Sequence, residues 1–190
     1  TNFLEFMPNT IISRDINVIK SFKEKNNSMI IKPLYGNGGE GVFHIKKDDE
    51  NLNSILEICF KVYDEPLIIQ EYIPEVREGD KRIILIDGEI VGAINRIPAE
   101  GESRSNMHVG GTPEKSIIST SDLEICKEIG PTLKQNGQFL VGIDVIGNNL
   151  TEINLTSPTG IQEIERFDGV NMAGTMWKLL EKKGVSGKKN

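Results

Sequence analysis

The chain has 190 residues, of which 37% are apolar and 26% are charged, and this composition is that of a globular protein with a hydrophobic core. Its formal net charge of -6 argues against nucleic acid as a partner, because binding to a phosphate backbone favours a basic surface. No apolar run approaches the roughly 18 residues of a membrane-spanning helix, so we expect no membrane partner.

The two cysteines, Cys59 and Cys126, lie within helical patterns, and we expect both to be small buried apolar residues rather than a disulfide or metal ligands. A reducing, cytoplasmic compartment fits this usage. The sequence opens with Thr1 in the middle of a pattern, which suggests a fragment of a longer protein.

In chain order, hydrophobic periodicity in the first part predicts a helix over 13–26, strands over 29–33 and 42–46, a helix over 51–63 and a strand over 67–73. Ser13 is the expected cap of the first helix, with Ile16, Ile19 and Phe22 on its apolar stripe. In the second helix we expect Val62 to face inward with Leu52, Ile55, Leu56 and Cys59.

The second part predicts a hairpin over 81–96 that turns at Asp87-Gly88, then a long loop over 97–115. A helix over 121–137 follows, with Ser121 and Glu124 at capping-box spacing and Gly137 after its end. The remaining elements are a hairpin over 139–155, turning at Asn148-Asn149, and a helix over 169–183 in which Trp177 is expected in the core. Antiparallel pairs dominate this order, which predicts an α+β fold.

A glycine-rich loop separates the strands over 29–33 and 42–46, and its glycines are Gly36, Gly38, Gly39 and Gly41. No Gly-Lys-Ser/Thr follows it and it leads into a strand, so it matches neither the P-loop nor the dinucleotide fingerprint. Such a loop can still fold over phosphates through its backbone N–H groups, and Lys32 lies on the preceding strand. A flexible hairpin with an exposed lysine is the alternative.

Three oxygen-bearing residues, Asp144, Glu152 and Asn154, lie on the two strands of the hairpin over 139–155. Glu152 and Asn154 share one face because they are two residues apart, and Asp144 is expected near their cross-strand partner. Carboxylate and amide oxygens on one face suit Mg²⁺. The alternative is three solvated residues on an open sheet face.

Basic residues surround the hairpin over 81–96: Lys81 and Arg82 open it, Arg96 closes it and Arg104 follows in the long loop. Arginine forks hold carboxylates and phosphates at two points. The alternative is ordinary surface charge at the ends of strands.

A phosphate loop, a lysine, a magnesium set and arginines are the parts of an enzyme that activates a substrate with ATP. The sequence resembles the ATP-grasp ligases, and among them the bacterial glutathione synthetase family. The resemblance covers about Pro8 to Trp177 and is carried by "IIKPLYGNGGEGVF", "QEYIPEVREGDKRIILIDGE", "RIPAEGESRSN", "GPTLK", "VGIDVIG" and "LTEINLTSPTGIQEI". Within these segments "EINLTSPTG" is the most discriminating.

This resemblance implies two lobes of largely antiparallel sheet with helices and the nucleotide between them. A small lobe over 1–73 would carry the glycine-rich loop and a large lobe over 74–190 the magnesium site. The family also has an N-terminal lobe and an ATP-contacting lysine that this chain lacks, so an inactive fragment is one implied state.

Site residues follow from the resemblance position by position. Implied nucleotide contacts are Lys32, Gly36, Gly38, Gly39, Gly41, Glu71, Tyr72, Ile73, Asp80 and Asn106, with the adenine at 71–73 and the ribose at Asp80. Implied magnesium ligands are Asp144, Glu152 and Asn154, with Mn²⁺ as an alternative ion. Arg82, Arg96 and Arg104 would be catalytic, and Ser157 and Thr159 would lie near the peptide substrate.

The implied reaction joins γ-glutamylcysteine and glycine at the expense of ATP. The cysteinyl carboxylate attacks the γ-phosphorus of MgATP, and the glycine amine then attacks the acyl phosphate, giving glutathione, ADP and phosphate. A homo-oligomer is implied for the complete protein. Two alternatives stay open: a related ATP-grasp ligase that adds glutamate to protein C-termini, and a nucleotide-binding fragment without catalysis.

Overall fold

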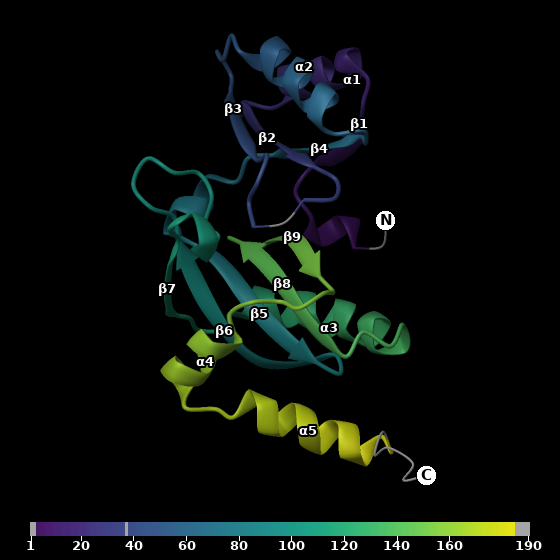
Figure 1. Ribbon diagram of the computed structural model, residues 1–190, viewed down its shortest axis with the longest axis vertical. Helices are drawn as coiled ribbons and strands as arrows, with labels where there is room; N and C mark the ends of the chain where they lie inside the picture. The colour runs from purple at the N-terminus through teal and green to yellow at the C-terminus, as the bar shows by residue number, and fades with distance from the viewer. Residues whose placement is uncertain (1–2, 37, 185–190) are drawn as a thin grey trace. The chain divides into compact units, whose positions relative to one another are not determined.

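The computed structural model describes residues 3–36 and 38–184 (Figure 1). Its strands are β1 (Thr10–Ser13), β2 (Ser28–Pro33), β3 (Phe43–Lys46), β4 (Leu67–Glu71), β5 (Asp80–Ile86), β6 (Glu89–Ile97), β7 (Thr112–Lys115), β8 (Leu140–Ile146) and β9 (Asn149–Asn154). Its α-helices are α1 (Ile16–Lys25), α2 (Leu52–Val62), α3 (Thr120–Gln135), α4 (Ile161–Asp168) and α5 (Met172–Lys182). Short 3-10 helices cover Leu4–Phe6, Pro74–Glu78 and Met107–Val109.

The chain divides into two compact units. Unit 1 is Thr1–Asp80 with Arg96–Thr112, and unit 2 is Lys81–Asn95 with Pro113–Asn190. The lobe boundary predicted between residues 73 and 74 stays a prediction. The two units are groups of residues in contact, and such a division does not test where one lobe ends and the next begins.

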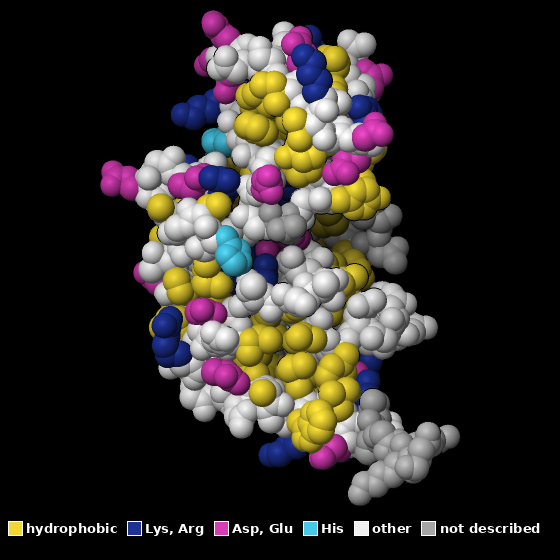
Figure 2. Space-filling view, in the orientation of Figure 1, with side chains coloured by type: hydrophobic (Ala, Val, Ile, Leu, Met, Phe, Trp, Pro, Cys, Tyr) yellow, Lys and Arg dark blue, Asp and Glu magenta, His cyan; other side chains and the backbone are white. Residues whose placement is uncertain are grey.

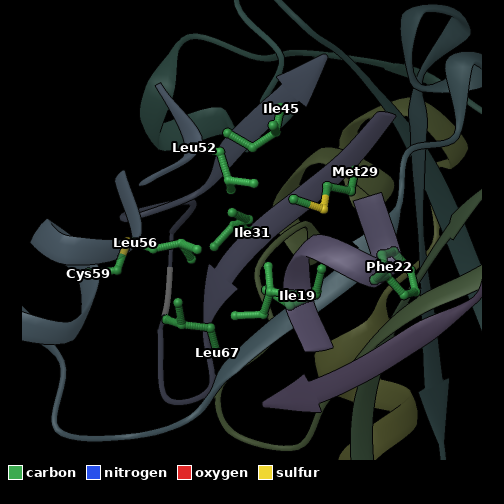
Figure 3. Packing of buried hydrophobic residues seen from close by; sticks show 10 residues of the cluster. Ile19, Phe22, Met29, Ile31, Ile45, Leu52, Leu56, Cys59 and Leu67 are labelled. Carbon is green, nitrogen blue, oxygen red and sulfur yellow. The ribbon is translucent and has the colours of Figure 1, made fainter. Parts of the chain in front are cut away.

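Unit 1 contains a four-stranded antiparallel sheet in the order β1-β4-β2-β3. Along β2 buried Met29, Ile31 and Pro33 alternate with the half-buried Ile30 and Lys32, as a strand with one covered face requires. Helices α1 and α2 cover the face that carries Met29 and Ile31 (Figures 1 and 3). The core between them is formed by Ile19, Phe22, Met29, Ile31, Ile45, Leu52, Leu56, Cys59, Leu67 and Ile69.

Unit 2 contains most of a five-stranded sheet in the order β7-β6-β5-β8-β9. The turn between β5 and β6 is Asp87-Gly88, as predicted, and both residues have positive φ. Strand β5 pairs with β8 and β8 with β9, both antiparallel. Hairpin formation is therefore predicted correctly by local sequence, whereas the pairing of β5 with β8 joins segments about sixty residues apart.

The second hairpin turns one residue earlier than predicted. Ile146 pairs with Asn149, so the turn is Gly147-Asn148 rather than Asn148-Asn149. Gly147 has a φ of 58°, a conformation that glycine adopts without a steric penalty and that places the turn there.

Both helix caps proposed from sequence are wrong. Asp15, not Ser13, caps α1, and its side chain accepts hydrogen bonds from Asn17 N and Val18 N. Ser13 instead belongs to β1. The capping box of α3 is Ser119 with Asp122, two residues before the predicted pair, while Gly137 does follow the helix end with a φ of 73°.

Two further expectations about the elements, both on burial, are wrong. Val62 is 66% exposed because it is the last residue of α2, and Trp177 is 66% exposed on α5 rather than buried in the core. Strands β1 and β7 and helix α4 are absent from the sequence-based prediction. Helix α4 has only eight residues, and its N-cap residue is Gly160, which supplies no side-chain cap.

The two cysteines are buried, as predicted, and neither forms a disulfide. Burial raises the pKa of the Cys126 thiol to about 12, so this cysteine is a packing residue and not a nucleophile. On this face of the molecule, hydrophobic side chains gather in the lower part of the view, and in the upper part charged side chains surround a further hydrophobic group (Figure 2). No helix in the described part of the chain combines the length and apolarity needed to cross a bilayer.

Candidate active site

Three residues of unit 2 form one row across neighbouring strands. Arg82 on β5 lies opposite Asp144 on β8, and Asp144 lies opposite Glu152 on β9. Directly opposed residues in antiparallel strands point to the same face, so the guanidinium and the two carboxylates are neighbours. Arg82 and Asp144 are 4% and 2% exposed, whereas Glu152 is exposed. This row therefore runs from the buried interior to solvent.

The Arg82–Asp144 contact is a two-point ion pair. Arg82 Nε donates to Asp144 Oδ1 at 2.5 Å, and Nη2 donates to Oδ2 at 2.9 Å. A third donor, Nη1, reaches the Thr159 carbonyl at 3.1 Å. The fork thus joins the sheet to the segment over 155–160, and only arginine offers this planar geometry.

Two features around this fork concern the residues that pack on it, Gly142 and the segment over 155–160. A Cβ at Gly142 would lie 2.7 Å from Pro158 Cβ and 3.1 Å from Arg82 Cδ, so a side chain there would displace both. Ser157 has a φ of 45°, which is rare for a residue other than glycine and marks a constrained turn in the segment "TSPTG". The segment that discriminates best in sequence is thus also the one that packs on Arg82.

Asn154 completes the predicted cation set. It pairs with Gly142, two residues along β8 from Asp144, so its side chain shares the face of Asp144 and Glu152. When the side-chain amide of Asn154 is flipped, so that its oxygen and nitrogen exchange places, the nitrogen donates to Glu152 Oε1 at 3.2 Å. The oxygen then accepts from Arg82 Nη2 at 3.3 Å. The expected convergence of the three residues on one face is confirmed.

The chemistry of this donor set fits a hard cation, because two carboxylates and one amide oxygen are ligands that Mg²⁺ accepts. Among the described residues no group of three or more His, Cys, Asp and Glu side chains could hold a metal ion. A cation here would therefore need the Asn154 oxygen beside the two carboxylates. That these residues are metal ligands stays a prediction.

Lys81 does not belong to this group. It neighbours Arg82 on β5 and therefore points to the opposite face, toward α3. Its ammonium pairs with buried Asp122 in the α3 capping box and donates to the Ile117 carbonyl at 3.1 Å. Lys81 is thus a structural anchor for the start of α3.

In unit 1, Asp80 and Arg96 form a second buried ion pair. Arg96 Nη2 donates to Asp80 Oδ2 at 2.6 Å, and Ser105 Oγ donates to the same oxygen at 2.5 Å. Arg96 is 2% exposed. The alternative that Arg82 and Arg96 are surface charges is therefore wrong. Ser105 is not among the predicted site residues, although it lies between two of them, Arg104 and Asn106.

The glycine-rich loop connects antiparallel β2 and β3, as predicted, although Asn37 lies outside the described residues. Arg104 Nη1 donates to the Gly39 carbonyl at 3.2 Å. A Cβ at position 39 would lie 2.8 Å from Asn106 Oδ1, so the loop over 97–111 packs directly on this glycine. Two segments selected separately from sequence therefore meet within unit 1.

A carboxylate holds Arg104 in this position. Arg104 Nη2 donates to Glu102 Oε2 at 2.6 Å. This hydrogen bond lowers the pKa of Glu102 to about 2 and raises the pKa of Arg104. Glu102 is thus ionised at neutral pH and fixes the guanidinium beside the glycine loop.

Three further nucleotide candidates of unit 1, Glu71, Tyr72 and Ile73, lie on or after β4. Glu71 accepts from Asn9 Nδ2 at 2.8 Å. Tyr72 stacks on His44, with ring centroids 3.8 Å apart and an angle of 15° between the planes. Burial, with Lys46 and Arg77 nearby, lowers the pKa of His44, so a neutral ring stacks on the tyrosine. Ile73 precedes the 3-10 helix over Pro74–Glu78.

Comparison with solved structures defines the class of the fold. The chain matches an ATP-grasp ligase, PsnB, complexed with minimal precursor, with a TM-score of 0.65 and 19% identity over 93% of this chain and 55% of that one. It matches a D-alanine–D-alanine ligase from Bacillus anthracis with a TM-score of 0.64 and 18% identity over 93% and 62%. These likenesses show an ATP-grasp fold, and the predicted α+β class with antiparallel sheets is confirmed.

Sequence comparison then identifies the family. Residues 1–169 match the family described as prokaryotic glutathione synthetase, ATP-grasp domain, and the chain belongs to this family. A glutathione synthetase from Agrobacterium fabrum is 53% identical over 183 residues, which are 96% of this chain and 57% of that protein. One from Brucella melitensis is 56% identical over 181 residues, which are 95% and 58%. The chain thus spans less than three fifths of these relatives.

Proposed function

We propose that the full-length protein is an ATP-dependent ligase that forms glutathione from γ-glutamylcysteine and glycine. Membership of the family and the names of relatives more than 50% identical support this function. The structural observation that carries it is the row of Arg82, Asp144 and Glu152, which supplies an arginine fork and two carboxylates on one sheet face. Because the chain spans only part of those relatives, the activity is assigned to the full-length protein.

In unit 2, Asp144, Glu152 and Asn154 would hold Mg²⁺, or Mn²⁺ in its place. When bound, the ion neutralises phosphate charge and polarises the phosphorus under attack. Arg82 adds a fixed positive charge for an acyl phosphate, where it is worth more than in water because it is already oriented. Ser157 and Thr159 are assigned to the peptide substrate, since their segment packs on Arg82.

Unit 1 is assigned to the nucleotide. Backbone N–H groups around Gly36, Gly38, Gly39 and Gly41 would face the phosphates, with Lys32 as a cation. Residues 71–73 would receive the adenine and Asp80 the ribose. Arg96 would steady phosphate charge, and Arg104 and Asn106 would hold the glycine loop closed over it, as their present contacts with Gly39 suggest.

The proposed reaction balances without a protein nucleophile. A carboxylate oxygen of γ-glutamylcysteine forms a bond to the γ-phosphorus as the bond to the bridging ADP oxygen breaks. The glycine nitrogen then bonds to the acyl carbon, phosphate leaves with the C–O bond electrons, and the amine loses a proton. The acyl phosphate must be kept from water, which is the physical use of loops that close. A cytoplasmic location and a homo-oligomeric state belong to this proposal as well.

Incubation of the full-length protein with MgATP, γ-glutamylcysteine and glycine tests the function. We expect glutathione and phosphate in equal amounts, and neither product without γ-glutamylcysteine. Glu152→Gln is the matched variant and should form neither product at the wild-type rate, since this exposed side chain keeps its shape and loses the charge that would hold the cation. Ligation of glutamate to a peptide C-terminus, or ATP binding without glutathione, would contradict the proposal.

A further inference from the structure

We infer that Gln70 is a positioning residue for Lys32: it holds the lysine ammonium in place, on the face of the unit 1 sheet opposite α1 and α2, ready for nucleotide phosphates. The inference rests on the proposed function, which assigns Lys32 to those phosphates. Gln70 lies on β4, one residue before the segment 71–73.

The strand register places the two side chains together. On β2 and β4, Ile30 pairs with Gln70 and Lys32 pairs with Ile68. Positions 30 and 32 share one face, so Gln70 and Lys32 point to the same side, away from the helices that cover Met29 and Ile31. Lys32 Nζ donates to Gln70 Oε1 at 3.4 Å. Gln70 is 5% exposed, so its amide is a buried polar group whose hydrogen bonds matter.

A relay of hydrogen bonds fixes the orientation of this amide. The Thr10 hydroxyl donates its only proton to the Pro8 carbonyl, with Oγ1 and O 2.8 Å apart. Toward Gln70 the same hydroxyl can therefore only accept, and it does so from Gln70 Nε2 at 3.0 Å. With the nitrogen committed to Thr10, the amide oxygen must face Lys32. The relay thus presents an acceptor, and not a donor, to the ammonium.

The Gln70 side chain is also uncharged, and this matters for phosphate binding. An amide oxygen orients the ammonium while leaving its full charge for a phosphate, whereas a carboxylate at position 70 would compete with the phosphate for it. Lysine carries a flexible four-carbon stem, and holding its end in place before binding reduces the entropy that binding must overcome. Gln70 would therefore raise affinity for phosphate-bearing nucleotides and leave affinity for the nucleoside unchanged.

Calorimetric titration of the full-length protein with ADP and with adenosine tests this. We expect Gln70→Leu to weaken ADP binding about three- to thirtyfold, which lies within the roughly 2- to 160-fold span of coupling between residues in contact, and to leave adenosine binding as it is. Lys32→Met should cause a similar loss, and the double variant should lose little more than either single variant. Gln135→Leu, the same change at an exposed glutamine of α3, should alter neither titration.

Because Gln70 is buried, Thr10 offers a second route that spares the amide. Thr10→Ser keeps the hydroxyl relay and should bind ADP as wild type does, whereas Thr10→Val keeps the shape, removes the relay and should weaken ADP binding. Additive losses in the Lys32 and Gln70 variants, or an equal loss for adenosine, would overturn the inference. Wild-type protein that fails to bind ADP would instead overturn the proposed function.

Discussion

Arg82 is the residue on which the candidate site of unit 2 depends. Arg82 is 4% exposed, and its charge is balanced by Asp144 on the neighbouring strand β8. Removing one partner of a buried pair costs about 3–5 kcal/mol, because the remaining charge is then uncompensated. The pair must therefore be tested with a change that keeps the charge.

Arg82→Lys is such a change. We expect kcat to fall about 10²-fold, as when one oriented donor to a transition state is removed, with the KM for ATP nearly unchanged. Lysine keeps the positive charge but cannot contact both Asp144 oxygens and the Thr159 carbonyl together. Steady-state kinetics of the full-length protein, with ATP and peptide varied separately, measure this.

Arg166→Lys is the matched control, since Arg166 is exposed on α4. Near-normal kinetics of the Arg82 variant, together with a lowered free energy of unfolding, would show that the fork is only a structural contact.

Among the elements, the glycine-rich loop and the loop over 97–111 are held together by contacts at Gly39. Gly38 and Gly39 both have positive φ, so alanine strains the backbone at either position. They differ in surroundings, because a Cβ at 38 meets nothing within 4 Å whereas one at 39 meets Asn106 and Arg104. Comparing alanine at position 38 with alanine at position 39 therefore separates the effect of backbone strain from the effect of contact with the loop over 97–111.

We therefore expect Gly39→Ala to raise the KM for ATP about fivefold more than Gly38→Ala does, which corresponds to roughly 1 kcal/mol beyond the backbone strain that both alanines share. The reason is that the new methyl group pushes Asn106 and Arg104 away from the loop. Kinetics of the two variants, with hydrogen exchange of the backbone over 97–111, measure the difference. Equal effects of the two alanines would mean that the contact at Gly39 plays no part.

The Glu102–Arg104 pair makes this loop sensitive to acid. The pKa of Glu102 is lowered to about 2 in the folded protein from its ordinary value of 4.5. A depressed carboxylate pKa stabilises the fold above the unfolded value, and this contribution is lost as the pH falls from about 4.5 toward 2. A carbon-13 titration of the Glu102 carboxyl should have its midpoint near 2, and Arg104→Gln should move the midpoint upward. A midpoint near 4.5 in the wild-type protein would contradict the pairing.

For the molecule as a whole, each unit has its own buried apolar residues. Ile31 is 0% exposed in the core of unit 1, and Ile143 is 0% exposed in unit 2. Ile31→Ala should cost about 2–5 kcal/mol of unfolding free energy through the cavity it leaves. We expect it to reduce hydrogen-exchange protection of β2, β4 and α2 while β5 and β8 keep theirs.

Ile143→Ala should give the reverse pattern and serves as the matched variant. If either change lowered protection equally in both units, the two would unfold as one cooperative body, and separate local stability would be excluded.

The sequence by itself determined what depends on neighbours along the chain. Period-2 and helical patterns located most elements, and Asp87-Gly88 set the first hairpin because only residues tolerant of positive φ fit its turn. The face shared by Glu152 and Asn154 followed from their spacing along one strand, whereas Asp144 reaches that face through a register shift between Asp144 and Val145 that the sequence did not predict. Residue types in known segments pointed to the family. Short elements without caps or strong periodicity, such as α4, gave no local signal.

Tertiary structure decided everything that depends on partners distant in sequence. Ser119–Asp122 and Ser121–Glu124 have the same capping-box spacing, and in the folded chain Lys81 packs against Asp122, so the pairs differ in their tertiary partners. The order of strands brings Arg82 to Asp144, and the fold brings Arg104 to Gly39 and Thr10 to Gln70. These pairings join residues that no periodicity links, because desolvated charges and buried amides must find partners wherever the strand order places them.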